Sequence, residues 1–180
     1  MLIISLYILL LLLVFGILLL LFFLRNPDRT PPHGDLILSP ADGLVVDILE
    51  EGNWIKIIIF MNFLNVHVQW VPYPGKVTSI EKFEGPAKPG FLPEASKNKQ
   101  VVSRLDTKIG EIILKQIVGI LVRRIETFAK VGKEVKIGQR FGRIVFGSRV
   151  ELWLPQGRAE VKVSKGQRVL AGVTVAALPK

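Results

Sequence analysis

The first 24 residues form one apolar run without a charged side chain, and no other feature constrains the chain as strongly. Only Ser5 and Gly16 break its hydrophobic character, while the 24 Lys and Arg and the 15 Asp and Glu residues all follow Leu24. As an α-helix, 24 residues extend roughly 36 Å, and the hydrocarbon core of a bilayer is about 30 Å thick. The sequence therefore predicts a membrane anchor helix over residues 1–24.

A cleaved signal peptide is the alternative for this run. The run lacks a basic start and a small-x-small cleavage site, and it is longer than the apolar part of a signal peptide. We therefore expect a retained anchor. Arg25 and Arg29 follow it and no charged side chain precedes it, so the positive-inside rule predicts a cytoplasmic location for the rest of the chain.

The remaining residues divide into a linker, 25–35, and one domain, 36–180. Three prolines in the linker end the helix and favour extended backbone. In the domain, short runs rich in β-branched residues, such as 54–60 and 143–146, alternate with Gly and Pro, and no long amphipathic helix is evident. The domain is therefore predicted to be mainly β, as a small barrel or sandwich.

Two pairs of segments in the domain repeat a pattern. Residues 40–48 match residues 72–80 at Pro, Gly, Val and Ile, and residues 138–142 are similar to residues 166–172. Each segment is a turn that leads into a strand. Such repeats indicate a barrel with internal pseudo-twofold symmetry, with the texture of biotinyl and lipoyl carrier domains.

Net charge and composition indicate which classes of binding partner the chain can have. The formal net charge is +9, which favours an anionic membrane surface. Nucleic acid is not predicted, because aromatic and basic residues do not alternate on any strand. The absence of cysteine excludes disulfides, thiol catalysis and cysteine–zinc sites. With only His33 and His67 and no carboxylate cluster, we expect no metal.

Three residues could carry chemistry. Asp42 lies in the segment 39–43, His67 in the segment 65–69 and Ser148 in the segment 146–149. Each has a structural explanation when taken alone, such as the turn chemistry of Asp before Gly. Together they supply an acid, a base and a hydroxyl, which can form an Asp–His–Ser arrangement if the fold brings them together.

An ordered set of motifs resembles the phosphatidylserine decarboxylase proenzymes, in particular the short, archaeal-type group. No single motif is specific, but the ordered set covers nearly the whole chain. The motifs are Phe23–Thr30, Ser39–Gly43, Phe60–Val68, Gly85–Phe91 and Gly138–Arg149. Two positions differ from the larger members of the family: these carry Leu-Gly-Ser-Thr where this chain has Phe146–Arg149, and a second histidine where this chain has Leu64.

The resemblance implies a self-processing enzyme whose cofactor is a covalent pyruvoyl group made from Ser148. Cleavage between Gly147 and Ser148 would be assisted by Asp42 and His67, with His67 held by Asp42 and taking the Ser148 proton. The fragments 1–147 and 148–180 would stay together as a heterodimer, and a further dimerisation is compatible with the sequence.

The reaction that the resemblance implies is decarboxylation of a serine phospholipid, phosphatidylserine or archaetidylserine, to the ethanolamine lipid and CO₂. His67 is then also the candidate proton donor during turnover. Nothing in the sequence distinguishes the two lipid tails.

Two other functions stay open from the residues alone. A membrane-anchored serine hydrolase would use the same three residues in an intact chain, but the sequence has no Gly-x-Ser-x-Gly motif. A non-catalytic biotinyl-like adaptor would carry a lysine with the modification signature at a hairpin tip, and none is found.

Overall fold

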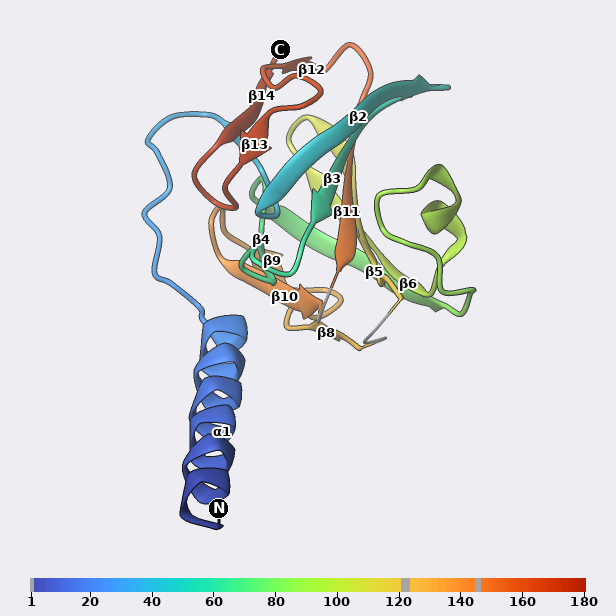
Figure 1. Ribbon diagram of the computed structural model, residues 1–180. Coiled ribbons are helices and arrows are strands. Elements are labelled where there is room, and N and C mark those ends of the chain that lie inside the picture. The colour runs from blue at the N-terminus through green and yellow to red at the C-terminus, as the bar shows by residue number, and fades with distance from the viewer. Residues whose placement is uncertain (1, 121–123, 145–146) are drawn as a thin grey trace.

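The computed structural model describes residues 2–120, 124–144 and 147–180. One helix, α1 (Leu2–Leu24), extends away from a domain built of strands (Figure 1). The predicted N-terminal helix and the predicted mainly-β domain are both confirmed. Residues Ile3–Leu24 are long and apolar enough to cross a membrane. Their large hydrophobic side chains are exposed, except that of Phe23, which is 9% exposed against the domain.

The strands are short, as the closely spaced Gly and Pro residues predict, and one 3₁₀ turn interrupts them. In chain order they are β1 (Ile37–Leu38), β2 (Gly43–Glu51), β3 (Trp54–Met61), β4 (Val68–Trp70), β5 (Gly75–Phe83), the 3₁₀ turn η1 (Pro93–Lys97), β6 (Gln100–Thr107), β7 (Gly110–Ile117), β8 (Ile125–Thr127), β9 (Glu134–Val135), β10 (Arg140–Ile144), β11 (Ser148–Pro155), β12 (Ala159–Val161), β13 (Arg168–Val169) and β14 (Val175–Pro179).

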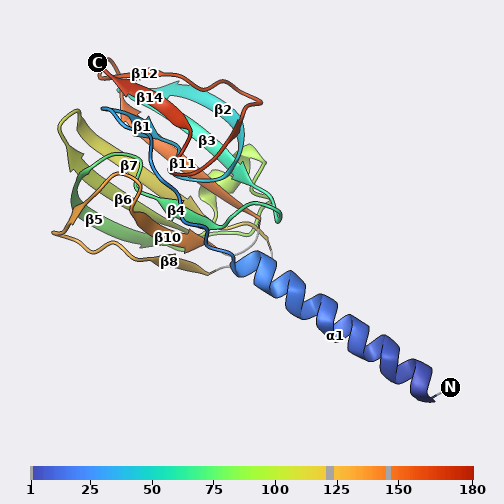
Figure 2. The ribbon, with the colours of Figure 1, turned by 90° about the vertical axis from the view of Figure 1, so that its left-hand side faces the viewer.

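The described strands form one large curled sheet and two small ones (Figures 1 and 2). The large sheet has the order β13-β2-β3-β11-β7-β6-β5-β9, and the small sheets have the orders β1-β14-β12 and β4-β10-β8. β11 lies in the middle of the large sheet, antiparallel to both β3 and β7. A strand in this position has its backbone paired on both edges.

The strand order has an internal pseudo-twofold symmetry. One half consists of β1–β3 and β11–β14, and the other half consists of β4–β10. In the large sheet the order β13-β2-β3-β11 of the first half corresponds to β9-β5-β6-β7 of the second, and the small sheet β1-β14-β12 corresponds to β4-β10-β8. The hydrogen bonds repeat this correspondence: Leu38 N donates to Pro72 O and Trp70 N donates to Pro40 O, both at 2.9 Å. The first repeated pattern, residues 40–48 and 72–80, is therefore the symmetric pair, as the sequence predicts.

The second repeated pattern relates turns that the symmetry does not exchange. Gly166 N donates to Val45 O at 2.8 Å, and the equivalent bond of the other half runs from Gly132 N to Val77 O, also at 2.8 Å. Gly138 instead bonds Val71 O. Gly138 and Gly166 resemble each other because both open turns of one type, in which a glutamine side chain accepts a hydrogen bond from the backbone.

The core lies on the inner face of the curled sheet. Because side chains alternate along a strand, every second residue of β11 points inward. Val150, Leu152 and Leu154 are fully buried there, against Ile57 and Ile59 of β3. Burial of each such side chain contributes about 1.5–3 kcal/mol relative to exposure. This packing fixes β11, and with it the position of Ser148 at the start of the strand.

The linker after α1 is extended, as its prolines predict, and it lies on the domain. Arg29 bonds Asp42, the Arg140 guanidinium bonds Asn26 and Asp28, and the Cβ of a residue at Gly138 would meet the Pro31 ring at 2.2 Å. These contacts fix the direction in which α1 leaves the domain (Figure 2).

Candidate active site

Ser148 is the first residue of β11, opposite Met61 of β3. It lies on the same face of the strand as the core residues Val150 and Leu152. Its side chain is fully buried, and its hydroxyl oxygen has no hydrogen-bond partner within the part of the chain that the structure describes. Leaving a buried polar group unpaired costs about 1–3 kcal/mol, and Ser103 shares this state, so the hydroxyl of Ser148 is distinguished by its position next to Gly147.

Gly147, on the other side of the predicted scissile bond, has a left-handed backbone with φ of +56°. A residue with a side chain rarely adopts this conformation, so glycine suits the position. Phe146 of the predicted cleavage motif and its neighbour 145 lie outside the described residues.

A loop between β5 and β6, residues 84–99, reaches the scissile bond. A Cβ added at Gly90 would lie 3.1 Å from the Gly147 carbonyl oxygen and 3.3 Å from the Ser148 carbonyl carbon. Gly90 therefore lies beside the Gly147 carbonyl, where a side chain would crowd the peptide bond that cleavage would break. The sequence motif Gly85–Phe91 contributes to the resemblance, but its position over the bond cannot be read from the residues alone.

Arg149, the next residue after Ser148, connects the same loop to the sheet. Its guanidinium forms a buried ion pair with Glu151, with an Nη2–Oε1 distance of 2.7 Å, and donates to the Leu92 carbonyl at 3.1 Å. Glu151 also accepts from Trp153 Nε1 at 2.9 Å. Both members of this buried ion pair have a further hydrogen bond, to Leu92 and from Trp153. The pair therefore holds the backbone at Arg149, just after the predicted scissile bond, in one position.

Asn98 closes the loop from its other end. Its side-chain oxygen accepts from the Lys88 N–H at 2.9 Å, and its side-chain nitrogen donates to the carbonyls of Lys88 and Val118, both at 2.8 Å. Asn98 is fully buried. These three bonds fold the loop back on β7 and hold Gly90 in place.

His67 lies just before β4 and is buried. Its Nδ1 is 2.9 Å from the Asn65 carbonyl oxygen, which can only accept, so Nδ1 carries the proton. In the neutral ring Nε2 then has the free lone pair. Nε2 is buried and has no hydrogen-bond partner among the described residues. The ring is thus prepared to act as a base through Nε2.

The segment 61–67 brackets the scissile bond. Met61 pairs with Ser148, and the His67 carbonyl accepts from Ile144 N at 3.1 Å, four residues before Ser148. Gln69 connects the two, since its amide lies 3.0 Å from the His67 carbonyl and 3.6 Å from the Met61 sulfur. The fold therefore brings His67 and Ser148, two of the predicted site residues, to one end of the sheet.

The last turn of α1 covers His67. The ring of Phe23 lies 5.4 Å from the His67 ring, centroid to centroid. Burial lowers the pKa of His67 from its usual 6.5; the bond to the Asn65 carbonyl opposes this, Arg25 lowers the pKa further and Asp42 raises it. Because burial is the largest influence, the imidazole stays neutral, as a general base must.

Asp42, the third predicted residue, is buried but does not hold His67 by a hydrogen bond. Its carboxylate accepts from Arg29 Nη2 at 2.9 Å and from the Ala171 N–H at 2.8 Å. The bidentate guanidinium is the stronger partner for a carboxylate, so Arg29 takes the place that we expected for His67. The Asn65 carbonyl orients the His67 ring instead, and Asp42 acts on His67 through its charge.

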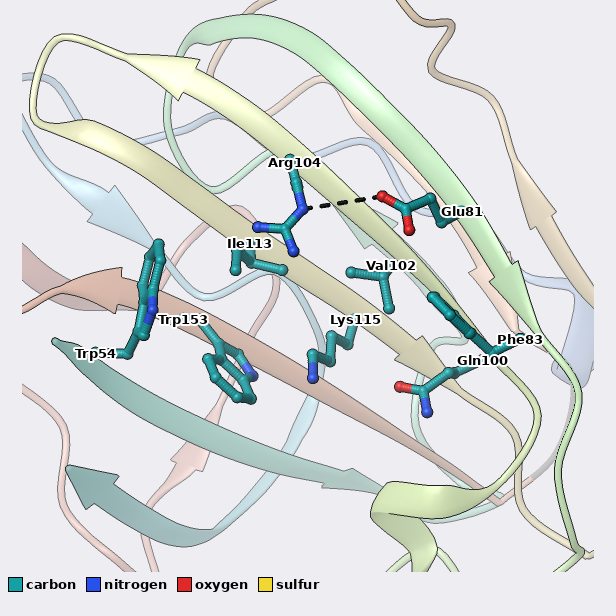
Figure 3. A pocket seen from close by; sticks show the side chains of 9 residues that line it. All are labelled: Trp54, Glu81, Phe83, Gln100, Val102, Arg104, Ile113, Lys115 and Trp153. Carbon is teal, nitrogen blue, oxygen red and sulfur yellow. Dashed lines mark ion pairs between the residues drawn. The ribbon is translucent and has the colours of Figure 1, made fainter. Parts of the chain in front are cut away.

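A cavity of about 410 Å³ lies elsewhere, on the outer face of the large sheet (Figure 3). Trp54, Trp153 and Lys115 line it, and Arg104 pairs with Glu81 at its side. None of the three predicted residues lines it. Ser148 points to the opposite face of β11, so we place the chemistry at the end of the sheet and not in this cavity.

A family model described as phosphatidylserine decarboxylase matches residues 17–177, and this match includes every residue of the site. The chain belongs to the phosphatidylserine decarboxylase family. Membership confirms the resemblance that the motifs indicate and leaves the hydrolase and adaptor interpretations without support.

Individual relatives agree with the family. The chain is 44% identical over 157 residues to the phosphatidylserine decarboxylase proenzyme of Streptomyces coelicolor, a match that covers 86% of this chain and 71% of the relative. It is 46% identical over 154 residues to the proenzyme of the same name in Thermobifida fusca, covering 84% and 70%. A Methanosarcina mazei protein named "Putative archaetidylserine decarboxylase proenzyme" is 40% identical over 159 residues, covering 88% and 74%.

A Gly90→Ala substitution tests the contact over the scissile bond of this decarboxylase. The added methyl group would move the Gly147 carbonyl by a few tenths of an ångström, and we expect processing to slow roughly three- to tenfold. The rate at which the two fragments appear after cell-free synthesis measures the effect. Ala87→Val, which adds bulk to an exposed residue of the same loop, is the control. Equal rates for both variants would show that the contact has no role.

A Phe23→Ala substitution tests how the anchor affects His67. If His67 is the base in processing, it must be neutral, and its lowered pKa keeps it neutral as pH falls below 6.5. Exposing the ring raises this pKa toward 6.5, so the fall in processing rate on the acid side should move to higher pH. Phe15→Ala, in the exposed middle of α1, should keep the parent profile. Identical profiles for all three proteins would contradict the coupling.

Proposed function

We propose that this proenzyme cleaves itself between Gly147 and Ser148 and converts Ser148 into a pyruvoyl group. The observation that carries the proposal is that Ser148 Oγ and His67 Nε2, both buried and without a partner among the described residues, lie at the end of the sheet where Gly90 flanks the Gly147 carbonyl. An acyl shift requires a free hydroxyl and a free base beside the peptide bond, and these two atoms supply them.

The chemistry balances with one water. His67 takes the proton of the Ser148 hydroxyl, whose oxygen attacks the Gly147 carbonyl carbon, and the peptide bond becomes an ester. Loss of the Ser148 Cα proton and breakage of the Cβ–O bond release Gly147 as a carboxylate. The dehydroalanine that remains takes up water and loses ammonia, which gives the pyruvoyl group.

The residues present suit this group. Position 148 begins a buried strand and pairs with Met61 of β3, and the next residues of β11 pair on both edges, so an α-keto acyl end at 148 would be held in place. The pyruvoyl carbonyl supplies the electron sink for decarboxylation of an amino acid headgroup. His67 is buried next to the Phe23 ring and can return a proton at the same end of the sheet. Asp42 contributes its negative charge to the imidazolium.

Both fragments should remain in one particle. β11 is hydrogen-bonded to β3 and β7, and β14 pairs with β1, so residues 148–180 are integral to two sheets. Separation would break both sheets and expose the core. We therefore infer a heterodimer of 1–147 and 148–180, with the anchor 1–24, the linker 25–35 and the domain 36–180 as its parts.

The substrate that fits is a serine phospholipid. Relatives carry the names of both phosphatidylserine and archaetidylserine decarboxylases, and the headgroup is the same in the two lipids. A helix that can span the bilayer would keep the enzyme with this substrate at high local concentration. The positive charges of Arg25 and Arg29 after the helix favour a domain on the cytoplasmic side.

The test is to reconstitute the purified full chain in vesicles that contain either phosphatidylserine or its archaeal ether analogue. We expect the ethanolamine lipid and CO₂ in equal amounts, and loss of activity after treatment with a carbonyl reagent such as phenylhydrazine. If a cleaved protein left both serine lipids unconverted, the assigned substrate would be wrong. Activity that survives the carbonyl reagent would overturn the pyruvoyl group.

A further inference from the structure

The turn between β3 and β4, Asn62–Asn65, presents two large apolar side chains to the outside. Phe63 is 59% exposed and Leu64 is 54% exposed. The two asparagines stiffen the turn: the Asn62 side chain accepts from Leu64 N at 2.9 Å, and the Asn65 side chain accepts from Asn62 N at 2.9 Å. The exposed pair is thus held outward on a rigid turn.

Three of the four residues of the 62–65 turn, Asn62, Leu64 and Asn65, have both backbone polar groups bonded from within the protein. In addition to the side-chain bonds, Asn65 N donates to Asn62 O at 3.1 Å, His67 donates to the Asn65 carbonyl, and Arg25 donates to the Leu64 carbonyl. A turn in water does not need these bonds, because water supplies them. A turn that enters hydrocarbon does, since each unpaired backbone group there costs several kcal/mol.

The 62–65 turn lies beside the end of the membrane helix. Arg25, the residue after α1, donates both to the Phe22 carbonyl at 2.8 Å and to the Leu64 carbonyl, and its guanidinium lies 3.8 Å from the centre of the Phe22 ring. If α1 spans the bilayer, Arg25 marks the headgroup level. Leu64 is bonded to it and lies at the same depth.

Charge agrees with this placement. Residues 57–75 contain no Lys, Arg, Asp or Glu, although the chain carries 39 such side chains in 180 residues. Most of these residues are buried, and the exposed ones are Phe63, Leu64 and Pro74. A turn that exposes two large apolar side chains and no charge of its own is suited to the boundary between headgroups and acyl chains.

We propose that Phe63 and Leu64 insert into the bilayer beside α1, so that the 62–65 turn is a second membrane contact that holds His67 at the headgroup level. The partner is the lipid surface and not another protein, because the turn lies beside the end of α1 and the backbone of Asn62, Leu64 and Asn65 is bonded within the protein. The inference rests on the proposed function, which places the domain at a bilayer. It adds to that function a turn that positions the site over a lipid headgroup.

The absence of cysteine permits a direct test on the full chain. Leu64→Cys is labelled with an environment-sensitive fluorophore and reconstituted in vesicles that contain lipids brominated near the headgroup end of the acyl chain. Leu49→Cys is the control: Leu49 is exposed and pairs with Lys56, five residues along β3 from Met61, or about 17 Å from the site. We expect blue-shifted, bromine-quenched emission at position 64 and water-like emission at position 49.

Two results would overturn the inference. One is emission at position 64 that matches position 49. The other is a label at position 64 that is shielded from aqueous iodide but insensitive to brominated lipid, which would assign the turn to a protein contact. Neither readout requires turnover, so a failure here is distinct from a failure of the decarboxylase function.

A kinetic measurement adds a second criterion. The double variant Phe63→Ser, Leu64→Ser should raise the KM for serine lipid in vesicles about tenfold or more, because two apolar side chains no longer enter the membrane. Leu49→Ser should keep the parent KM. An unchanged KM for the double variant would count against the inference.

Discussion

Ser148→Ala should leave the chain intact and wholly inactive. Without the hydroxyl there is no nucleophile for the Gly147 carbonyl and no precursor for the pyruvoyl group, so both processing and decarboxylation are lost. The variant should fold, because Ser148 Oγ makes no hydrogen bond to the described residues and its removal leaves no partner behind. Denaturing gel electrophoresis shows the intact chain, and vesicle assays show the missing activity.

The chain offers a closely matched control for this substitution. Ser103 of β6 is also fully buried, and its hydroxyl also lacks a partner in the described part of the chain. Ser103→Ala should be cleaved at the parent rate. If Ser148→Ala were cleaved at the same bond, the proposed route through the Ser148 oxygen would be wrong.

His67→Ala should slow processing by about 10²–10⁴-fold, the usual contribution of a positioned general base. The residue is buried, so the loss of its side chain also lowers the free energy of unfolding, and a slow rate alone would not separate the two effects. Added imidazole does separate them: it should restore part of the processing rate if the missing group is a base. His33→Ala is the control, because His33 is exposed in the linker.

Rescue by imidazole, together with an unaffected His33→Ala protein, would support His67 as the base. A His67→Ala protein that is folded by circular dichroism and processed at the parent rate would remove His67 from the reaction. A folded but unprocessed protein that imidazole does not rescue would indicate a positioning role of the His67 ring, through its bond to the Asn65 carbonyl and its contact with Phe23.

Local patterns predicted the parts of this fold that local chemistry controls. The uncharged run gave α1, and the Gly- and Pro-punctuated β-branched runs gave β3 and its neighbours, because turn geometry and side-chain alternation depend on adjacent residues. The symmetry was evident for the same reason.

Contacts between distant segments were not accessible in this way. Asp42 pairs with Arg29 because the linker folds back on the domain, and the sequence gives no signal for that path. The same holds for Gly90 against the Gly147 carbonyl and for Phe23 against His67, which lie 57 and 44 positions apart in the chain. Gly90 lies in the motif Gly85–Phe91, and a glycine often marks a close approach of two backbone segments, so this residue was a hint of the contact with Gly147.

The most direct measurement is an intact-mass spectrum of the purified protein under denaturing conditions. The account predicts two chains, one ending at Gly147 and the other comprising residues 148–180 and lighter by one ammonia than its unmodified sequence. A single full-length chain, or a 148–180 fragment with an unmodified serine at its start, would contradict it.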